Sequence, residues 1–139
     1  MSDLDSVRPN SFEAWVLASR PKTWLLALSP VLLGLSLSLL MTRRIDIPVA
    51  LATALLSVLM QAISNMENDA AYTKRKAENG TRRGLPRATS LKLLSVSAVE
   101  KAIKVLALIA LLDTLFLMYA GGWIIVAITV GSIIAAYFY

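Results

Sequence analysis

Long stretches of apolar residues, separated by short polar segments, dominate the sequence. Two of them, residues 23–41 and 47–66, contain no charged side chain and are 19 and 20 residues long. At about 1.5 Å per residue, each would extend over roughly 28–30 Å, close to the ~30 Å hydrocarbon core of a bilayer. Two further runs, 102–120 and 123–139, have similar character, although the former contains Asp113. Because backbone groups in a bilayer must be hydrogen-bonded internally, we predict four transmembrane helices over these ranges.

A shorter amphipathic segment precedes the first apolar run. Asn10 is a suitable N-cap for it. Its larger apolar side chains and one serine would share a helical face: Phe12, Trp15, Val16 and Ser19. We therefore predict an interfacial helix over residues 10–20 that lies on the membrane surface. The fold class that follows is all-α and integral to the membrane, with residues 1–139 as one domain and 67–101 as a cytoplasmic loop.

Basic residues are distributed unevenly about these runs. Twelve Lys and Arg residues lie before the first run, within 67–101 or just inside the third run, against two, Arg43 and Arg44, on the other side. Since cytoplasmic segments carry the excess of Lys and Arg, we predict that both termini are cytoplasmic.

The composition narrows the chemistry. Hydrophobic residues make up 57% of the chain and charged residues 17%, with a net charge of +5, no cysteine and no histidine. Disulfides, thiolate nucleophiles, histidine-based triads and Cys or His metal sites are thereby excluded. The basic residues lie mainly on one side of the apolar runs, as in membrane proteins. The predicted partner is therefore the bilayer and not a nucleic acid. Carboxylates, amides, hydroxyls, Lys, Arg and Tyr remain as functional groups.

At its cytoplasmic end, the second apolar run acquires polar residues at helical spacing. Gln61, Asn65, Asn68 and Tyr72 are spaced by four, three and four residues, and Asp69 borders the same helical face. Amides in membrane helices often only hydrogen-bond to a neighbouring helix, and for Gln61 alone we favour that interpretation. Four such residues together with a carboxylate indicate a functional site, because ionisable groups at membrane depth are costly.

A basic, turn-rich segment follows this polar face. Gly80, Gly84 and Pro86 favour a loop, and three arginines project from it: Arg82, Arg83 and Arg87. Guanidinium groups bind phosphate oxygens in a bidentate manner. Asp69 beside such a loop could hold Mg²⁺, which commonly uses one or two carboxylates together with substrate phosphates. The pattern predicts a diphosphate site at the cytoplasmic face, suited to a substrate with an apolar tail.

Three motifs in this order resemble those of the UbiA-type membrane prenyltransferases, in particular the 1,4-dihydroxy-2-naphthoate polyprenyltransferases. The motifs are Arg20-Pro21-Lys22-Thr23, Ser64-Asn65-Met66-Glu67-Asn68-Asp69 and Arg82-Arg83-Gly84-Leu85-Pro86-Arg87. The resemblance covers roughly residues 15–110. It implies a nine-helix fold with a central cavity, of which this chain would form the first half. It further implies Mg²⁺-dependent transfer of a polyprenyl group from its diphosphate to an aromatic acceptor, for menaquinone synthesis in the bacterial inner (plasma) membrane.

The resemblance also assigns individual residues. It implies that Asn65, Asn68 and Asp69 are catalytic, and that Asp69 and Glu78 are the Mg²⁺ ligands. It implies substrate binding by five further side chains: Arg20, Lys22, Tyr72, Arg82 and Arg87.

The sequence departs from the family pattern in two places. Tyr72 stands where the family has the second carboxylate of its Asn-Asp-x-x-Asp motif, and no second Asp-rich motif occurs in the 139 residues. We therefore expect a truncated enzyme that is inactive alone, with self-association or partner helices completing the bundle. The alternative is a non-catalytic, half-length relative that binds a lipid or a partner protein. A small transporter has less support, because the polar face gathers at one interface instead of crossing the midplane.

Overall fold

Helices are the only regular secondary structure in the described part of the chain. The structure is a computed structural model that describes residues 7–75 and 87–138, apart from the side chain of Tyr137. Its elements are α1 (Phe12–Ser19), the short 3-10 helix η1 (Pro21–Thr23), α2 (Trp24–Thr42), α3 (Ile47–Lys74), α4 (Val96–Gly121) and α5 (Ile124–Phe138). The predicted all-α fold class is confirmed.

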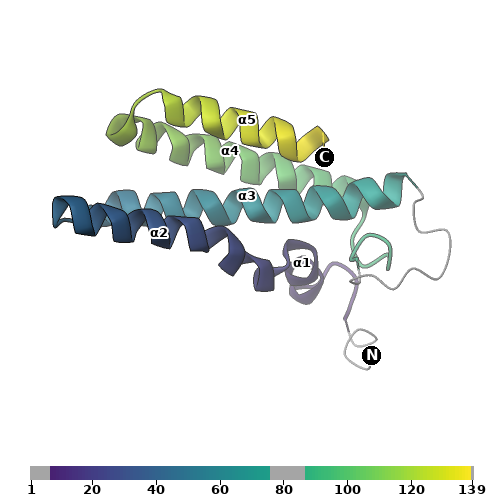
Figure 1. The fold of residues 1–139 in the computed structure, drawn as a ribbon. Coiled ribbons are helices and arrows are strands. Elements are labelled where there is room, and N and C mark those ends of the chain that lie inside the picture. Colours follow the sequence, from purple (N-terminus) through teal and green to yellow (C-terminus); the bar gives the residue numbers. More distant parts are fainter. Residues whose placement is uncertain (1–6, 76–86, 139) are drawn as a thin grey trace.

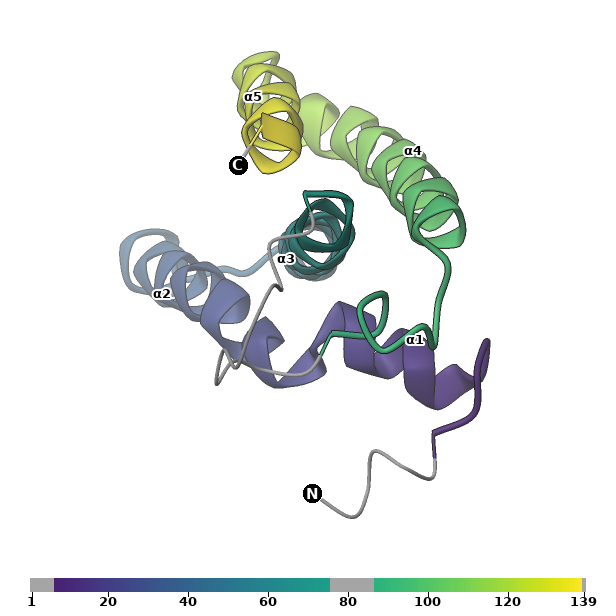
Figure 2. The same ribbon diagram turned by 90° about the vertical axis from the view of Figure 1, so that its right-hand side faces the viewer.

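Helix α3 forms the centre of the bundle. It contacts α1, α2, α4 and α5, and Figure 2, which views the bundle end-on, shows those four helices arranged around it. In Figure 1, α2 runs antiparallel to α3, and α4 runs antiparallel to α5. Helix α1, the end of α3, the start of α4 and the end of α5 therefore lie at one end of the bundle, which we call the polar end.

Three helical segments are long and apolar enough to cross a membrane. They are Phe12–Thr42, which contains α1 and α2, Ile47–Lys74 and Val96–Gly121. Helix α5 is apolar but has only 15 residues, about 22 Å of helix, where the apolar run 123–139 predicts a fourth span. No residue of α2 is buried, as expected of a helix whose apolar side chains face lipid.

Some predicted boundaries are wrong. Helix α3 continues to Lys74 and α4 begins at Val96, so both ends of the predicted loop 67–101 are helical. The apolar run ends at Met66, but the helix does not, because Asp69 and Ala70 remain buried in tertiary contacts. An ion pair between Lys74 and Glu100 joins the two helix ends.

The N-terminal helix also differs from its predicted range and position. It begins at Phe12 because the Ser11 side chain accepts a hydrogen bond from the N–H of Ala14, whereas Asn10 lies outside the helix with φ +58°. Its side chains Ala14 and Ala18 are fully buried against α3 and the segment before α4. These small residues let α1 pack closely, and the predicted interfacial position remains a prediction.

The main cluster of buried apolar side chains lies at the same end of the bundle as the predicted site, the polar end. Its buried members come from α1, α3, the turn before α4 and the first turn of α4: Ala14, Ala18, Met66, Ala70, Ala88, Leu93, Leu94 and Val99. At the opposite end, Gly122 makes the turn between α4 and α5 with φ +82°, a conformation that L side chains rarely adopt. The core therefore holds together the segments that carry the predicted site.

Candidate functional site

Asn65 connects α3 to the junction between α1 and α2. Its side chain is only 8% exposed, and its Nδ2 donates to the carbonyl oxygen of Ser19 at 2.9 Å and to Thr23 Oγ1 at 2.8 Å. The Thr23 hydroxyl in turn donates to the carbonyl oxygen of Arg20 at 2.9 Å. Gln61 Nε2 lies 3.4 Å from both Thr23 Oγ1 and Asn65 Oδ1. Asn65 thus fixes the backbone on both sides of Arg20.

The junction needs this support because its backbone is unusual. Arg20 adopts the left-handed conformation, with φ 51° and ψ 65°, and ends α1. A non-glycine residue in that region is strained and persists only where surrounding contacts hold it. The Trp24 indole N–H adds a bond to the carbonyl oxygen of Ser19 at 3.1 Å. The consequence is a defined position for the Arg20-Pro21-Lys22-Thr23 motif at the polar end.

Asp69 makes the second connection, from α3 to the turn formed by residues 87–94. The residue is 0% exposed. Its Oδ2 accepts the backbone N–H of Ala88 at 3.0 Å, and its Oδ1 accepts the backbone N–H of Thr89 at 3.2 Å and the Thr89 hydroxyl. Thr73, one turn further along α3, lies within hydrogen-bond distance of the hydroxyls of Thr89 and Ser90. Asp69 therefore stabilises the turn that immediately follows Arg87.

Arg87 stacks on Tyr72. The guanidinium carbon lies 3.4 Å from the centroid of the Tyr72 ring, a cation–π contact. Tyr72 is three residues after Asp69, so the two side chains follow one another along the same side of α3. Where the resemblance implies a second carboxylate, the chain thus places an aromatic ring beneath an arginine.

The other predicted site residues make fewer contacts or lie outside the described part of the chain. The Nη2 atom of Arg20 is buried and makes no hydrogen bond within the described residues, whereas Lys22 is exposed. Asn68 is half-buried, and its side chain makes no hydrogen bond to another described residue. Glu78 and Arg82 lie outside the described residues, as do Gly80, Arg83, Gly84 and Pro86.

The described residues do not fit a resident Mg²⁺ at Asp69. Three donors from Ala88 and Thr89 already occupy most of the acceptor sites of the carboxylate, which is fully buried. Across residues 7–75 and 87–138, no group of three or more His, Cys, Asp or Glu side chains comes together. The local donor set therefore suits a buried carboxylate that stabilises a turn.

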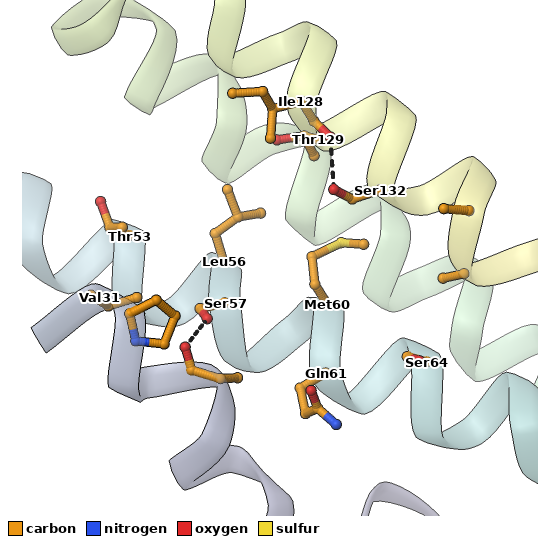
Figure 3. A pocket seen from close by; sticks show the side chains of 14 residues that line it. Val31, Thr53, Leu56, Ser57, Met60, Gln61, Ser64, Ile128, Thr129 and Ser132 are labelled. Carbon is orange, nitrogen blue, oxygen red and sulfur yellow. Dashed lines mark hydrogen bonds between the residues drawn. The ribbon is translucent and has the colours of Figure 1, made fainter. Parts of the chain in front are cut away.

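An open groove of about 700 Å³ runs along α3 between α2 and α5 (Figure 3). Most of its lining is apolar, with a row of polar side chains from α3 and α5: Thr53, Ser57, Gln61, Ser64, Thr129 and Ser132. Ser57 crosses to α2 by donating to the carbonyl oxygen of Ala27 at 2.7 Å. Because Gln61 belongs both to the groove and to the Asn65–Thr23 cluster, the groove leads directly to the polar end.

A second groove of about 670 Å³ lies between α1, α2, α3 and α4 and is almost wholly apolar. The side chains predicted to face the membrane line it: Phe12, Trp15, Val16 and Ser19. That face of α1 is therefore turned toward the bundle at least in part, and Phe12 remains 79% exposed.

The sequence did not reveal the hydrogen-bond partners of Asn65 and Asp69. Thr23 and Thr89 supply the hydroxyl contacts, and the backbone of Ser19 and Ala88 supplies the others. A threonine within three residues of each predicted arginine, Arg20 and Arg87, is the one signal that was present in the sequence.

A scan against protein-family models, a search of curated proteins and a search of solved structures found no match to this chain.

Proposed function

We propose that this chain is a membrane prenyltransferase-like protein that binds a polyprenyl diphosphate at the polar end. In this proposal the polar end faces the cytoplasm of a bacterium, the N-terminus is cytoplasmic and α5 is a fourth membrane-embedded helix. The observation that carries the proposal is that α3 fixes two arginine-bearing segments at the polar end, the end to which the groove along α3 leads. Asn65 holds the Arg20 segment, and Asp69 holds the turn after Arg87.

The head of the site has the chemistry of a phosphate clamp. The buried Nη2 of Arg20 makes no hydrogen bond in the described part of the chain, and a phosphate oxygen would supply the missing acceptor. Arg87 is held over Tyr72, and Lys22 adds a third cationic side chain. Guanidinium groups bind phosphate oxygens with two parallel hydrogen bonds. The hydrocarbon tail would occupy the groove between α2, α3 and α5.

The reaction that the resemblance implies would begin at the allylic C–O bond of the bound lipid. That bond breaks, the electron pair leaves with the diphosphate, and the arginines stabilise the charge that develops on the leaving group. A carbon of the electron-rich aromatic acceptor then forms the new C–C bond and loses a proton. Arg20 and Arg87 are the residues of this chain that we assign to stabilisation of the leaving group.

Binding is tested with radiolabelled farnesyl diphosphate on the chain in nanodiscs. We expect Arg20→Gln and Arg87→Gln each to weaken binding by about tenfold, because each loses a charged bidentate donor. Arg44→Gln, at the opposite end of the bundle, serves as the matched control and should leave the affinity unchanged. Farnesol, which lacks the diphosphate, should not distinguish the variants. Equal affinity of all four proteins for farnesyl diphosphate would contradict the proposed site.

A non-catalytic lipid-binding protein is the second candidate, and the hydrogen bonds of Asp69 favour it. That carboxylate is committed to the 87–94 turn, and Tyr72 replaces a carboxylate. We expect the 139-residue chain in nanodiscs to give no prenylated product from polyprenyl diphosphate, 1,4-dihydroxy-2-naphthoate and Mg²⁺. Mass spectrometry of the lipid extract provides the measurement, and a product above the protein-free background would establish catalysis by this chain alone.

A further inference from the structure

We infer that Asp69 and Tyr72 are positioning residues that together hold the Arg87 guanidinium in place at the polar end, and that Asp69 is not a metal ligand. The placement of Arg87 follows from contacts within the chain. Its consequence for lipid binding rests on the proposed function. An Asp-x-x-Tyr pair one helical turn apart thereby takes the place of the paired carboxylates that the resemblance implies.

The Asp69 carboxylate fixes the backbone next to Arg87. It accepts hydrogen bonds from the backbone N–H groups of the two residues that follow Arg87, Ala88 at 3.0 Å and Thr89 at 3.2 Å. The Thr89 hydroxyl donates to the same carboxylate, and the whole group is excluded from solvent. Hydrogen bonds to an ionised acceptor are about twice as strong as neutral ones, and burial strengthens them further. The start of the 87–94 turn therefore cannot move far from α3.

The Tyr72 ring fixes the other end of the arginine. Asp69 holds the backbone that directly follows Arg87, and the Arg87 guanidinium carbon lies 3.4 Å from the centroid of the Tyr72 ring. A planar guanidinium stacked on an aromatic face has its N–H groups in a plane roughly parallel to the ring, so the ring sets the direction in which they point. A carboxylate in place of Tyr72 would instead pair with Arg87 and compete with phosphate oxygens.

The inference is tested by two measurements on the full chain in micelles or nanodiscs. Nuclear magnetic resonance reports the ring-current shift of the Arg87 side-chain protons caused by Tyr72, and hydrogen exchange reports the amides of Ala88 and Thr89. Asp69→Asn has a single acceptor oxygen, and its NH₂ group would oppose a backbone N–H. We expect it to accelerate exchange of these amides at least about tenfold, the factor for one lost charge-assisted hydrogen bond, and to remove the ring-current shift.

Matched variants separate positioning from general loss of structure. Asp113→Asn removes a carboxylate from α4 and should change neither measurement. Tyr72→Phe should keep the Arg87 shift and Tyr72→Leu should abolish it, while both leave the Ala88 and Thr89 amides protected. Thr89→Val, which removes one donor, should raise exchange by a smaller factor and serves if Asp69→Asn does not fold. Unchanged exchange and an unchanged Arg87 shift in Asp69→Asn and Thr89→Val would overturn the inference.

Inorganic pyrophosphate distinguishes positioning from metal ligation. We expect Asp69→Asn to weaken pyrophosphate binding by the same factor in Mg²⁺ and in EDTA, and to have no further effect in an Arg87→Gln background. A loss confined to Mg²⁺, with protected amides, would make Asp69 a metal ligand and overturn the inference. If the wild-type chain binds neither pyrophosphate nor farnesyl diphosphate, the proposed function fails, while the exchange and ring-current measurements still decide the placement of Arg87.

Discussion

Replacement of Asn65 by leucine is expected to lower the free energy of unfolding by about 2–3 kcal/mol, whereas the same change at Asn68 should alter it by no more than about 0.5 kcal/mol. The two asparagines lie three residues apart on α3. Both Nδ2 hydrogen bonds of Asn65 end on the α1–α2 junction, at Ser19 and Thr23. Asn68 makes none within the described residues. The leucine at position 65 would leave the carbonyl oxygen of Ser19 with fewer donors in a buried setting.

The measurement is reversible unfolding of the chain in micelles, for instance by titration with a denaturing detergent, with both variants compared to the wild type. A second readout locates the effect. Proteolysis within α1 or at the junction should accelerate in Asn65→Leu only, because Arg20 is then no longer held in its left-handed conformation. Equal destabilisation by the two leucines would mean that Asn65 does not support the junction.

The apolar pattern of the sequence predicts much of the fold because a bilayer constrains it so strongly. The run 23–41 corresponds to α2, Trp24–Thr42, and the run that begins at Ile47 corresponds to the start of α3. Asp46 accepts the N–H of Val49 and so caps α3 where the pattern changes. Hydropathy does not show where α3 ends, because residues 67–74 are polar and their helix depends on contacts with α1 and with the 87–94 turn.

The candidate site was predictable only in part for a related reason. The spacing of Asn65, Asp69 and Tyr72 places them along one helix, and their contacts tie them to the α1–α2 junction and to the 87–94 segment. Their partners are mainly backbone groups, the carbonyl of Ser19 and the N–H groups of Ala88 and Thr89. Any residue type carries such groups, so the sequence does not mark them. A carboxylate that stabilises a turn and one that binds a cation look alike until its hydrogen bonds are known.

The fully buried Asp69 of α3 and the half-buried Asp113 of α4 should respond in opposite directions to replacement by leucine. Asp113 lies within α4, and its buried Oδ2 makes no hydrogen bond within the described residues. An aspartate at the centre of a membrane helix costs roughly 2.5–3.5 kcal/mol on insertion scales, whereas leucine is favourable by roughly 0.5 kcal/mol. Asp113→Leu is therefore expected to stabilise the protein by about 2–3 kcal/mol.

Asp69→Leu should instead destabilise it by about 3 kcal/mol or more, since the N–H groups of Ala88 and Thr89 would remain buried without an acceptor. The pair is measured in the same detergent titration as the asparagine variants, with the wild type as reference. Stabilisation at position 113 together with destabilisation at position 69 would show that burial alone does not decide the contribution of a membrane carboxylate. The sign of that contribution would depend on whether the carboxylate accepts hydrogen bonds. A loss of stability in Asp113→Leu would reveal that this carboxylate has a stabilising partner in the membrane.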